Sequence, residues 1–280
     1  GKEIQCFVII TIALFWLAAF LVATPGEILE GMFLIVTSRD ALITDYFELG
    51  GYGAAFFNAG AVLLLGYLLL IKEKANFTGL TLAALYMNAG FAFFGKNPLN
   101  VWPILLGTIL YTKFQHTRLS RYIYTALFGT CLAPFVTELV YILPFGRWVN
   151  MILAIFTGIL IGFILPPLSV HTASMHMGYN LFNVGFSAGI LAFVIVCVLR
   201  SFGIVTESTL IWKEGIPPVL AVAGYGYFLF AIGYGLMLNK GKISGLPKIL
   251  RHPGRAVADF VLMDGVGITF INMGIVGMVA

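Results

Sequence analysis

The sequence has little charge, few cysteines and no recognisable catalytic motif. Only 10% of its 280 residues are charged, whereas soluble domains have about a quarter. Cys6, Cys131 and Cys197 lie in apolar segments without CxxC or CxxH spacing, so we expect them to pack as small apolar side chains. No HExxH, GxSxG or Walker motif and no carboxylate cluster occurs. These absences argue against an enzyme, a metal centre and a bound cofactor.

Hydrophobic residues dominate instead, at 60% of the chain against about 45 to 50% in soluble domains. A transmembrane helix needs about 20 predominantly apolar residues, and the chain contains several runs of this length. These runs do not alternate between apolar and polar residues as the strands of a membrane barrel do. The sequence therefore predicts an all-α polytopic transmembrane helix bundle, with the lipid bilayer as its surroundings.

Seven apolar segments are long enough to be spans. They lie near residues 4–24, 47–70, 122–143, 148–167, 180–200, 216–238 and 259–280. Residues 77–114 form two apolar pieces interrupted at Gly95-Lys96-Asn97-Pro98, which predicts a re-entrant hairpin or two complete spans. Residues 25–45 and 239–258 carry proline, glycine and charges, so we expect loops or interfacial helices there.

The chain also contains a duplication. Residues 45–66 return as residues 259–280, an offset that pairs Asp45 with Asp259 and Asn58 with Asn272. We expect a first repeat at residues 1–214, with five spans and the split hairpin, and the start of a second repeat at 215–280. The second copy is expected to lack roughly its last three fifths.

The distribution of lysine and arginine predicts the topology. If residues 77–114 cross the membrane zero or two times, eleven basic residues share one side and four face the other. The first group is Lys2, Lys72, Lys74, Lys113, Arg118, Arg121, Lys240, Lys242, Lys248, Arg251 and Arg255, and the second is Arg39, Arg147, Arg200 and Lys213. The positive-inside rule then predicts a cytoplasmic N-terminus for a chain in the cytoplasmic membrane. Each repeat has an odd number of spans, so the two repeats are expected to be inverted.

A motif of apolar residue, asparagine, apolar residue and glycine occurs four times within apolar segments, centred on Asn58, Asn88, Asn183 and Asn272. An amide in hydrocarbon needs hydrogen-bond partners, and its donors and acceptors can line a path for a polar solute. The alternative is that each asparagine only bonds neighbouring helices while the glycine allows close packing.

Three further residues are candidates for the site. Lys96 and Asn97 lie at the expected apex of the hairpin, where a cation and a helix N-terminus favour an anionic or carbonyl-bearing ligand. In the alternative, they lie in an ordinary solvated turn between two spans. Glu138 is the one acidic residue well inside a span, which makes it a candidate coupling group for protons or cations. A small shift in register would instead place Glu138 at the membrane surface.

Several of these segments together resemble a known family. They are Phe93-Phe-Gly-Lys-Asn-Pro-Leu-Asn100, Gly50-Gly-Tyr-Gly-Ala-Ala-Phe-Phe-Asn-Ala-Gly60 and its second copy. Over its whole length the chain resembles a bacterial family of duplicated multi-pass membrane proteins of unknown function. More distantly, it is similar to urea transporters, which also have inverted five-helix repeats and Asn-Pro-Leu breaks. The order of the elements differs, and no pore residue is assigned from that similarity.

The sequence thus predicts a transporter or channel for a small polar solute, with its site between two inverted repeats. Asn58, Asn88, Asn183 and Asn272 are expected to line the path, with Lys96 and Asn97 at the hairpin apex. The alternatives are a membrane-embedded scaffold or sensor and, less favoured, an intramembrane enzyme. The basic stretch 240–255 is expected to meet lipid headgroups, not nucleic acid, and a homo-oligomer is compatible with the sequence.

Overall fold

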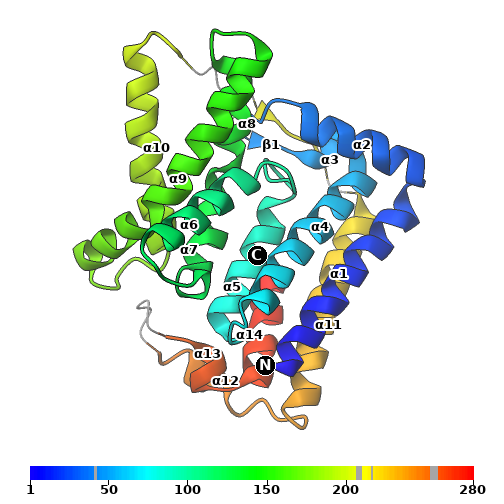
Figure 1. Cartoon of the computed structure of the whole chain (residues 1–280). Coiled ribbons are helices and arrows are strands. Elements are labelled where there is room, and N and C mark those ends of the chain that lie inside the picture. The colour runs from blue at the N-terminus through cyan, green and yellow to red at the C-terminus, as the bar shows by residue number, and fades with distance from the viewer. Residues whose placement is uncertain (41–42, 206–209, 216, 253–257) are drawn as a thin grey trace.

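The protein folds as a bundle of α-helices (Figure 1). The computed structural model describes residues 1–40, 43–205, 210–215, 217–252 and 258–280. Within these residues, six helical segments are long and apolar enough to cross a membrane. They are α1 (Lys2–Val22), α4 (Gly51–Lys72), α7 to α8 (Ile123–Ile142), α9 (Arg147–His176), α10 (Asn183–Ser201) and α11 (Pro218–Leu238). The expected fold class, an all-α polytopic helix bundle, is confirmed.

The span at 122–143 is continuous in sequence but not a single regular helix. It consists of α7 (Ile123–Gly129), one turn of 3₁₀ helix, η2 (Thr130–Leu132), and α8 (Ala133–Ile142). Pro134 lies in the first turn of α8, where a backbone N–H would have no partner within the helix, so the missing N–H of proline costs no hydrogen bond. The 3₁₀ turn brings the Thr130 side chain into the interior, where it is 1% exposed.

The interrupted segment 77–114 forms two short helices, α5 (Gly79–Phe91) and α6 (Trp102–Phe114). Each has 13 residues and is therefore about 20 Å long, which is shorter than the roughly 30 Å hydrocarbon core of a bilayer. The bend between them includes Gly95, which has a φ of +83°. A Cβ atom at Gly95 would lie 2.8 Å from the Pro134 ring. The helix break predicted at Gly95 to Pro98 is therefore present.

The remaining elements are short. Helix α2 (Pro25–Thr37) begins with a capping box in which Thr24 and Glu27 bond to each other's backbone. Strand β1 (Ile43–Thr44) pairs in parallel with β2 (Leu210–Ile211). A 3₁₀ turn, η1 (Leu119–Arg121), precedes α7. The other short helices are α3 (Tyr46–Leu49), α12 (Leu246–Ile249), α13 (Phe260–Met263) and α14 (Val266–Val279).

The expected span at 259–280 differs from the structure. The chain breaks there into α13 and α14, because Gly265 between them has a φ of +95°. Helix α14 is apolar and has 14 residues, fewer than the other spans. The same kind of break separates α3 from α4, where Gly51 has a φ of +80°.

Segments 214 residues apart have matching local structure. Helices α3 and α13 start and end at equivalent residues, and each is capped by an aspartate, Asp45 and Asp259. Helix α1 packs on α4, and α11 packs on α14. In Figure 1, α1 runs upwards from the N-terminus while α11 runs downwards, and α4 and α14 also run in opposite directions.

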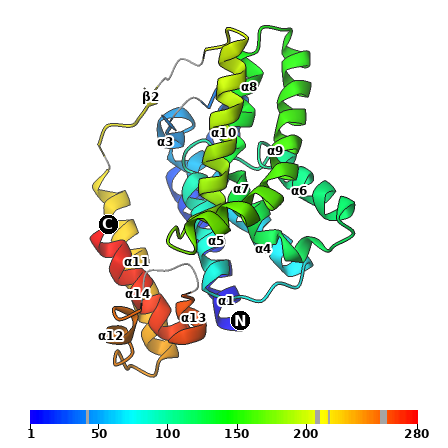
Figure 2. The same ribbon diagram turned by 90° about the vertical axis from the view of Figure 1, so that its left-hand side faces the viewer.

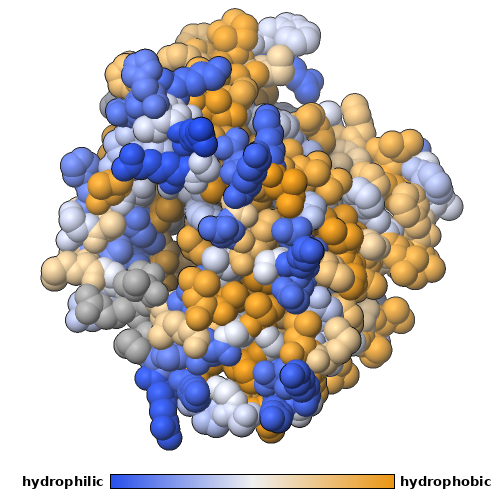
Figure 3. Space-filling model, turned by 60° about the horizontal axis from the view of Figure 1, so that its bottom comes forward, coloured by the Kyte–Doolittle hydropathy of each residue, from blue (hydrophilic) through white to orange (hydrophobic). Residues whose placement is uncertain are grey.

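The core lies between α1, α4, α5 and α7, with a second cluster between α6, α8 and α9. Phe7 of α1 is fully buried and stands near five aromatic rings, including Phe270 of α14, 4.2 Å away between ring centroids. Figure 2 shows α11 and α14 together on one side of the molecule and α6 and α9 on the other. Figure 3 shows hydrophilic patches on the lower face among large hydrophobic areas.

Candidate functional site

Lys96 lies in the bend between α5 and α6 and points into the interior of the bundle. Its side chain is 1% exposed. The Lys96 ammonium donates to the Asn88 side-chain oxygen at 2.8 Å and to the Thr130 hydroxyl at 2.9 Å. Its nitrogen also lies 5.3 Å from the centroid of the Phe91 ring. Lys96 is therefore held by one amide, one hydroxyl and one aromatic ring.

No acidic side chain among the described residues forms an ion pair with Lys96. Burial of an ammonium without a counter-charge costs several kcal/mol even after the protein relaxes. Hydrogen bonds to Asn88 and Thr130 offset part of this cost. A buried lysine without an acidic partner is a feature that structural packing does not require, and it marks this place as a candidate site.

A small cavity lies beside this lysine. Its volume is about 10 Å³, which is enough for about one water molecule. Asn88 and Thr130, the two partners of Lys96, are its polar lining residues, and the rest of the wall is apolar. The other lining residues are Val62, Leu65, Gly66, Leu69, Val101, Leu105 and Leu127. All of these residues belong to the expected first repeat.

Asn58 of α4 holds the hairpin bend from the opposite side. Its amide nitrogen donates to the carbonyl oxygen of Ala92 at 2.6 Å and to that of Lys96 at 2.8 Å. These bonds satisfy carbonyls that the end of α5 and the bend leave without a helical partner. The Asn58 side-chain oxygen is buried and has no hydrogen-bond partner among the described residues. Asn58 and Asn88 thus both contact the bend around Lys96.

Asn97 and Asn100 shape the bend itself. The Asn97 side chain accepts from the backbone N–H groups of Leu99 and Asn100, each at 3.0 Å. The Asn100 side-chain oxygen accepts from the N–H of Asn97 at 2.9 Å. Asn97 therefore accepts hydrogen bonds from the backbone of the turn. Asn97 is 1% exposed and Asn100 is 8% exposed, so neither asparagine lies in a solvated turn.

Glu138 is buried in α8, with its side chain 8% exposed, and has a cationic partner. Arg39 donates to its two carboxylate oxygens through Nε at 2.7 Å and Nη2 at 2.6 Å. Such a two-bond pair is a strong form of charge-assisted hydrogen bonding. Glu138 is thus buried within the protein, and the cation beside it is Arg39, not Lys96.

Asp40 is a site residue that the sequence analysis missed. It lies in the connection after α2, outside the six candidate spans, and is 3% exposed. Tyr46 donates to it at 3.1 Å and the Asn100 amide at 3.4 Å. Burial raises the pKa of Asp40 to about 7, partly opposed by the hydrogen bond from Tyr46. In the sequence, Asp40 follows Arg39 in a segment that is typical of a surface loop, so nothing there indicated a buried carboxyl. The one related signal was the turn Asn97-Pro98-Leu99-Asn100, whose Asn100 contacts Asp40 in the structure.

The structure does not bring Asn183 and Asn272 to the hairpin bend by any described hydrogen bond. Asn183, at the start of α10, accepts from Thr172 at 2.9 Å and bonds His176 at 2.8 Å. Asn272 makes no side-chain hydrogen bond with another described residue. Asn183 therefore joins α9 to α10, whereas Asn58 and Asn88 surround Lys96.

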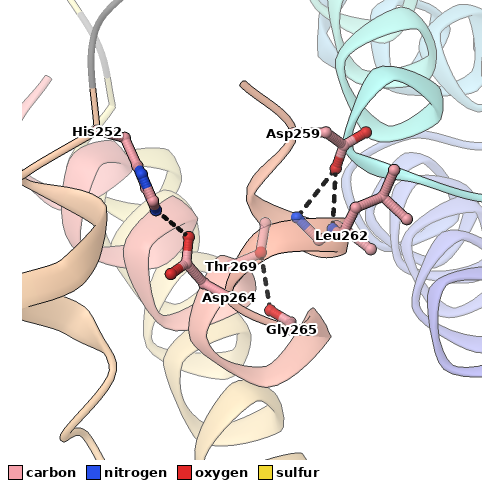
Figure 4. A network of polar contacts seen from close by, with 7 residues as sticks. His252, Asp259, Leu262, Asp264, Gly265 and Thr269 are labelled. Carbon is pink, nitrogen blue, oxygen red and sulfur yellow. Dashed lines mark hydrogen bonds and ion pairs between the residues drawn. The ribbon is translucent and has the colours of Figure 1, made fainter. Parts of the chain in front are cut away.

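The second copy contacts the hairpin through Asp259. This carboxylate caps α13 through the N–H groups of Val261 and Leu262, as Figure 4 shows. It also accepts from the N–H groups of Gly79 and Leu80 at the start of α5, at 3.0 and 3.3 Å. One side chain thus caps helices from both expected repeats.

A second polar contact in Figure 4 holds the start of α14. His252 bonds Asp264 at 2.8 Å, and Thr269 donates to the carbonyl oxygen of Gly265. The Asp264 side chain is 3% exposed, so this contact satisfies a buried carboxylate beside the break between α13 and α14. Among the described residues, no group of three or more His, Cys, Asp or Glu side chains is placed to hold a metal ion.

These features define a multi-pass α-helical membrane protein with a buried polar centre at a broken hairpin. The chain belongs to the family described as "Protein of unknown function (DUF1576)", whose model matches residues 24–201 and 238–280. The resemblance to an uncharacterised family is thereby confirmed. No curated protein and no solved structure matches the chain, so the distant similarity to urea transporters is not shown.

Proposed function

We propose that the protein is a transporter or channel for a small polar solute, and that it is not an enzyme. The observation that carries this proposal is the buried Lys96, held by Asn88 and Thr130 beside a small cavity in an apolar bundle. Ionisable groups inside membrane bundles commonly mark solute or ion pathways, because their burial has no packing benefit. Asn58, Asn88, Lys96 and Asn97 would form the site, with Asn183 and Asn272 elsewhere along the path.

We further propose that the two repeats are inverted, with the pseudo-two-fold axis in the membrane plane. The opposite directions of α1 and α11, and of α4 and α14, support this arrangement (Figure 1). The matching aspartate caps of α3 and α13 support equivalence of the two copies. In such transporters the solute site lies between the repeats near the midplane. The described residues around Lys96 all belong to the first repeat, so the second repeat would complete the site from its other side.

The hairpin formed by α5 and α6 is proposed to be re-entrant, entering and leaving on one side. Its two helices are too short to cross a bilayer. In addition, the Tyr124 hydroxyl at the start of α7 bonds the Thr81 hydroxyl and the carbonyl oxygen of Asn76. The chain that follows α6 therefore returns to the place where α5 began.

We propose that this side is the cytoplasmic side of a bacterial inner membrane. The N-terminus, the end of α4, and α12 and α13 lie at the same end of the bundle in Figure 1. An excess of lysine and arginine at that end agrees with the positive-inside rule. The bilayer is then the main partner, and a homo-oligomer remains compatible with the exposed apolar helices.

Solute flux into liposomes tests the proposal. We expect the reconstituted protein to carry at least one of urea, glycerol, chloride and nitrate. Flux should fall at least about tenfold in Lys96→Met, because a hydrogen bond from a charged donor to the solute contributes about 1.5 to 3 kcal/mol. It should also fall in Asn58→Leu and in Asn272→Leu. Lys113→Met, at an exposed lysine, is the matched control and should keep its flux.

Equal flux in the wild type and in empty liposomes for all four solutes would contradict a transport function. Unchanged flux in both asparagine variants would remove Asn58 and Asn272 from the path.

A scaffold or sensor is the alternative, favoured by the hydrogen bonds that Asn58 and Asn183 make to neighbouring backbone. Cysteines placed at these two positions distinguish the two functions. A small aqueous thiol reagent should label them if a solute path exists. Complete protection of both would favour a closed, packed bundle.

A further inference from the structure

Lys96 in the hairpin bend and Asp40 beside that bend are both buried ionisable groups, and neither forms an ion pair with another described residue. We infer that the bend couples the two, with Lys96 anchoring a small monovalent anion and Asp40 binding the proton that travels with it. This inference depends on the proposed transport function and names its solute class and its coupling ion.

Lys96 supplies the anion-binding part. Its ammonium has two described acceptors, Asn88 and Thr130, and an ammonium has three protons to donate. The cavity is lined by those two acceptors and is apolar elsewhere, so an anion that takes the place of one water there would lie beside the two groups that hold the Lys96 ammonium. A counter-charge at this place would offset the cost of burying the ammonium.

Asp40 supplies the proton-binding part. The groups that face it are the Tyr46 hydroxyl from α3, the Asn100 amide from the bend, and Thr137 and Glu138 from α8. Arg39 is adjacent in the chain, but it gives two hydrogen bonds to Glu138. Asp40 is therefore a buried carboxyl whose described hydrogen-bond partners are neutral.

This arrangement distinguishes Asp40 from Glu138, the coupling candidate of the sequence. Glu138 would have to break a two-bond ion pair to take up a proton. Asp40 has no ion pair with a described residue to break, and its hydrogen bonds from Tyr46 and Asn100 are longer, at 3.1 and 3.4 Å. Because burial raises the pKa of Asp40 to about 7, its proton can leave or bind near neutral pH.

Asn97 and Asn100 connect the two groups. The Asn100 amide donates to Asp40, to Thr137 and to the carbonyl oxygen of Gly95, directly before Lys96. Protonation of Asp40 weakens the attraction for that amide, which loosens the bend that positions Lys96. The charge also balances, because one proton on Asp40 offsets one monovalent anion at Lys96.

Proton-driven anion uptake tests the inference. Liposomes containing the protein are given chloride or nitrate outside at a pH one unit below the inside, with the membrane potential clamped at zero. For one proton per anion, this gradient supports up to about tenfold accumulation. We expect accumulation in the wild type, an accumulation ratio near one in Asp40→Asn, and no anion uptake in Lys96→Met. Glu30→Gln, at an exposed acid, should behave as the wild type.

If the Asp40→Asn variant fails to fold, two further measurements still test the role of Asp40. Tyr46→Phe removes one donor to the carboxylate, so coupling should remain but its pH midpoint should rise. Infrared titration of the wild type should show a protonated carboxyl band that disappears near neutral pH.

The outcomes separate the inference from the proposed function. Uptake of urea or glycerol alone, or anion uptake that ignores the pH gradient, overturns the inference and leaves transport in place. Accumulation retained in Asp40→Asn, or a Tyr46→Phe profile identical to the wild type, removes Asp40 from the coupling. No movement of any of these solutes contradicts both.

Discussion

At the scale of single residues, the asparagines that look alike in the sequence have different surroundings. Asn58 is fully buried and bonds two backbone carbonyls of the hairpin, whereas Asn272, its repeat partner, makes no described side-chain hydrogen bond. The motif predicts a buried amide in each case. The partner of that amide depends on which helix lies opposite, and the hairpin lies opposite Asn58.

This difference gives a stability prediction. Asn58→Leu leaves the carbonyl oxygens of Ala92 and Lys96 buried without their donor, at a cost of about 1 to 3 kcal/mol. Asn272→Leu is the matched control and should cost less than about 1 kcal/mol. Denaturant unfolding of the two purified variants measures this. Equal losses in both variants would contradict the role given to Asn58.

Asp40 gives a pH dependence at the same scale. Because the pKa of Asp40 is raised from 3.8 to about 7, the folded state keeps a proton over this range that the unfolded state has released. Stability should therefore fall as pH rises from about 4 to about 7, by at most about 1.4 kcal/mol per pH unit, and then level off. Denaturant midpoints measured across this range should fall in the wild type. A slope that is just as steep in Asp40→Asn would exclude Asp40 as its source.

At the scale of elements, the site depends on how closely α6 packs against α9. A Cβ atom at Gly162 would lie 2.0 Å from the carbonyl oxygen of Ile104, and one at Gly107 would lie 2.0 Å from that of Ile159. The two helices therefore touch through their backbones, as in small-residue packing within membranes. The contact with α9 fixes the position of α6. Because the bend that carries Lys96 lies directly before α6, the contact also helps to position that bend.

The packing prediction compares two glycines in helices. Gly162→Val must push α6 and α9 apart and should cost at least about 1 to 3 kcal/mol. A Cβ atom at Gly189 in α10 would meet nothing within 4 Å. The stability of Gly189→Val should therefore be close to that of the wild type, apart from the difference in helix propensity. Thermal unfolding in detergent compares them. A Gly162→Val protein as stable as Gly189→Val would mean that the helices do not touch there.

At the scale of the whole molecule, the inverted arrangement predicts opposite exposure of equivalent positions. Glu48 of α3 and Leu262 of α13 are 214 residues apart and are both exposed in the structure. In a protein freed of Cys6, Cys131 and Cys197, cysteines at these two positions should react with a membrane-impermeant thiol reagent from opposite sides. Labelling from the same side would contradict the inversion.

The class of fold, six of the seven expected spans and the break in the hairpin follow from the sequence alone. Long apolar runs have one stable solution in lipid, because a helix satisfies its own backbone hydrogen bonds. Gly95 and Pro98 likewise end a helix for local reasons, so the break was predictable. Lys96 and Asn97 were identified for the same reason, since a cation and an amide at an apolar break are conspicuous.

Which residues contact one another could be seen only in the folded chain. The pairing of Glu138 with Arg39 joins residues 99 positions apart. Lys96 and Thr130 are 34 positions apart, and Asp259 and Gly79 are 180 apart. No local pattern encodes such contacts, because they arise from the packing of helices on one another. For that reason Asp40, Asn100 and Thr130 entered the site only through the fold.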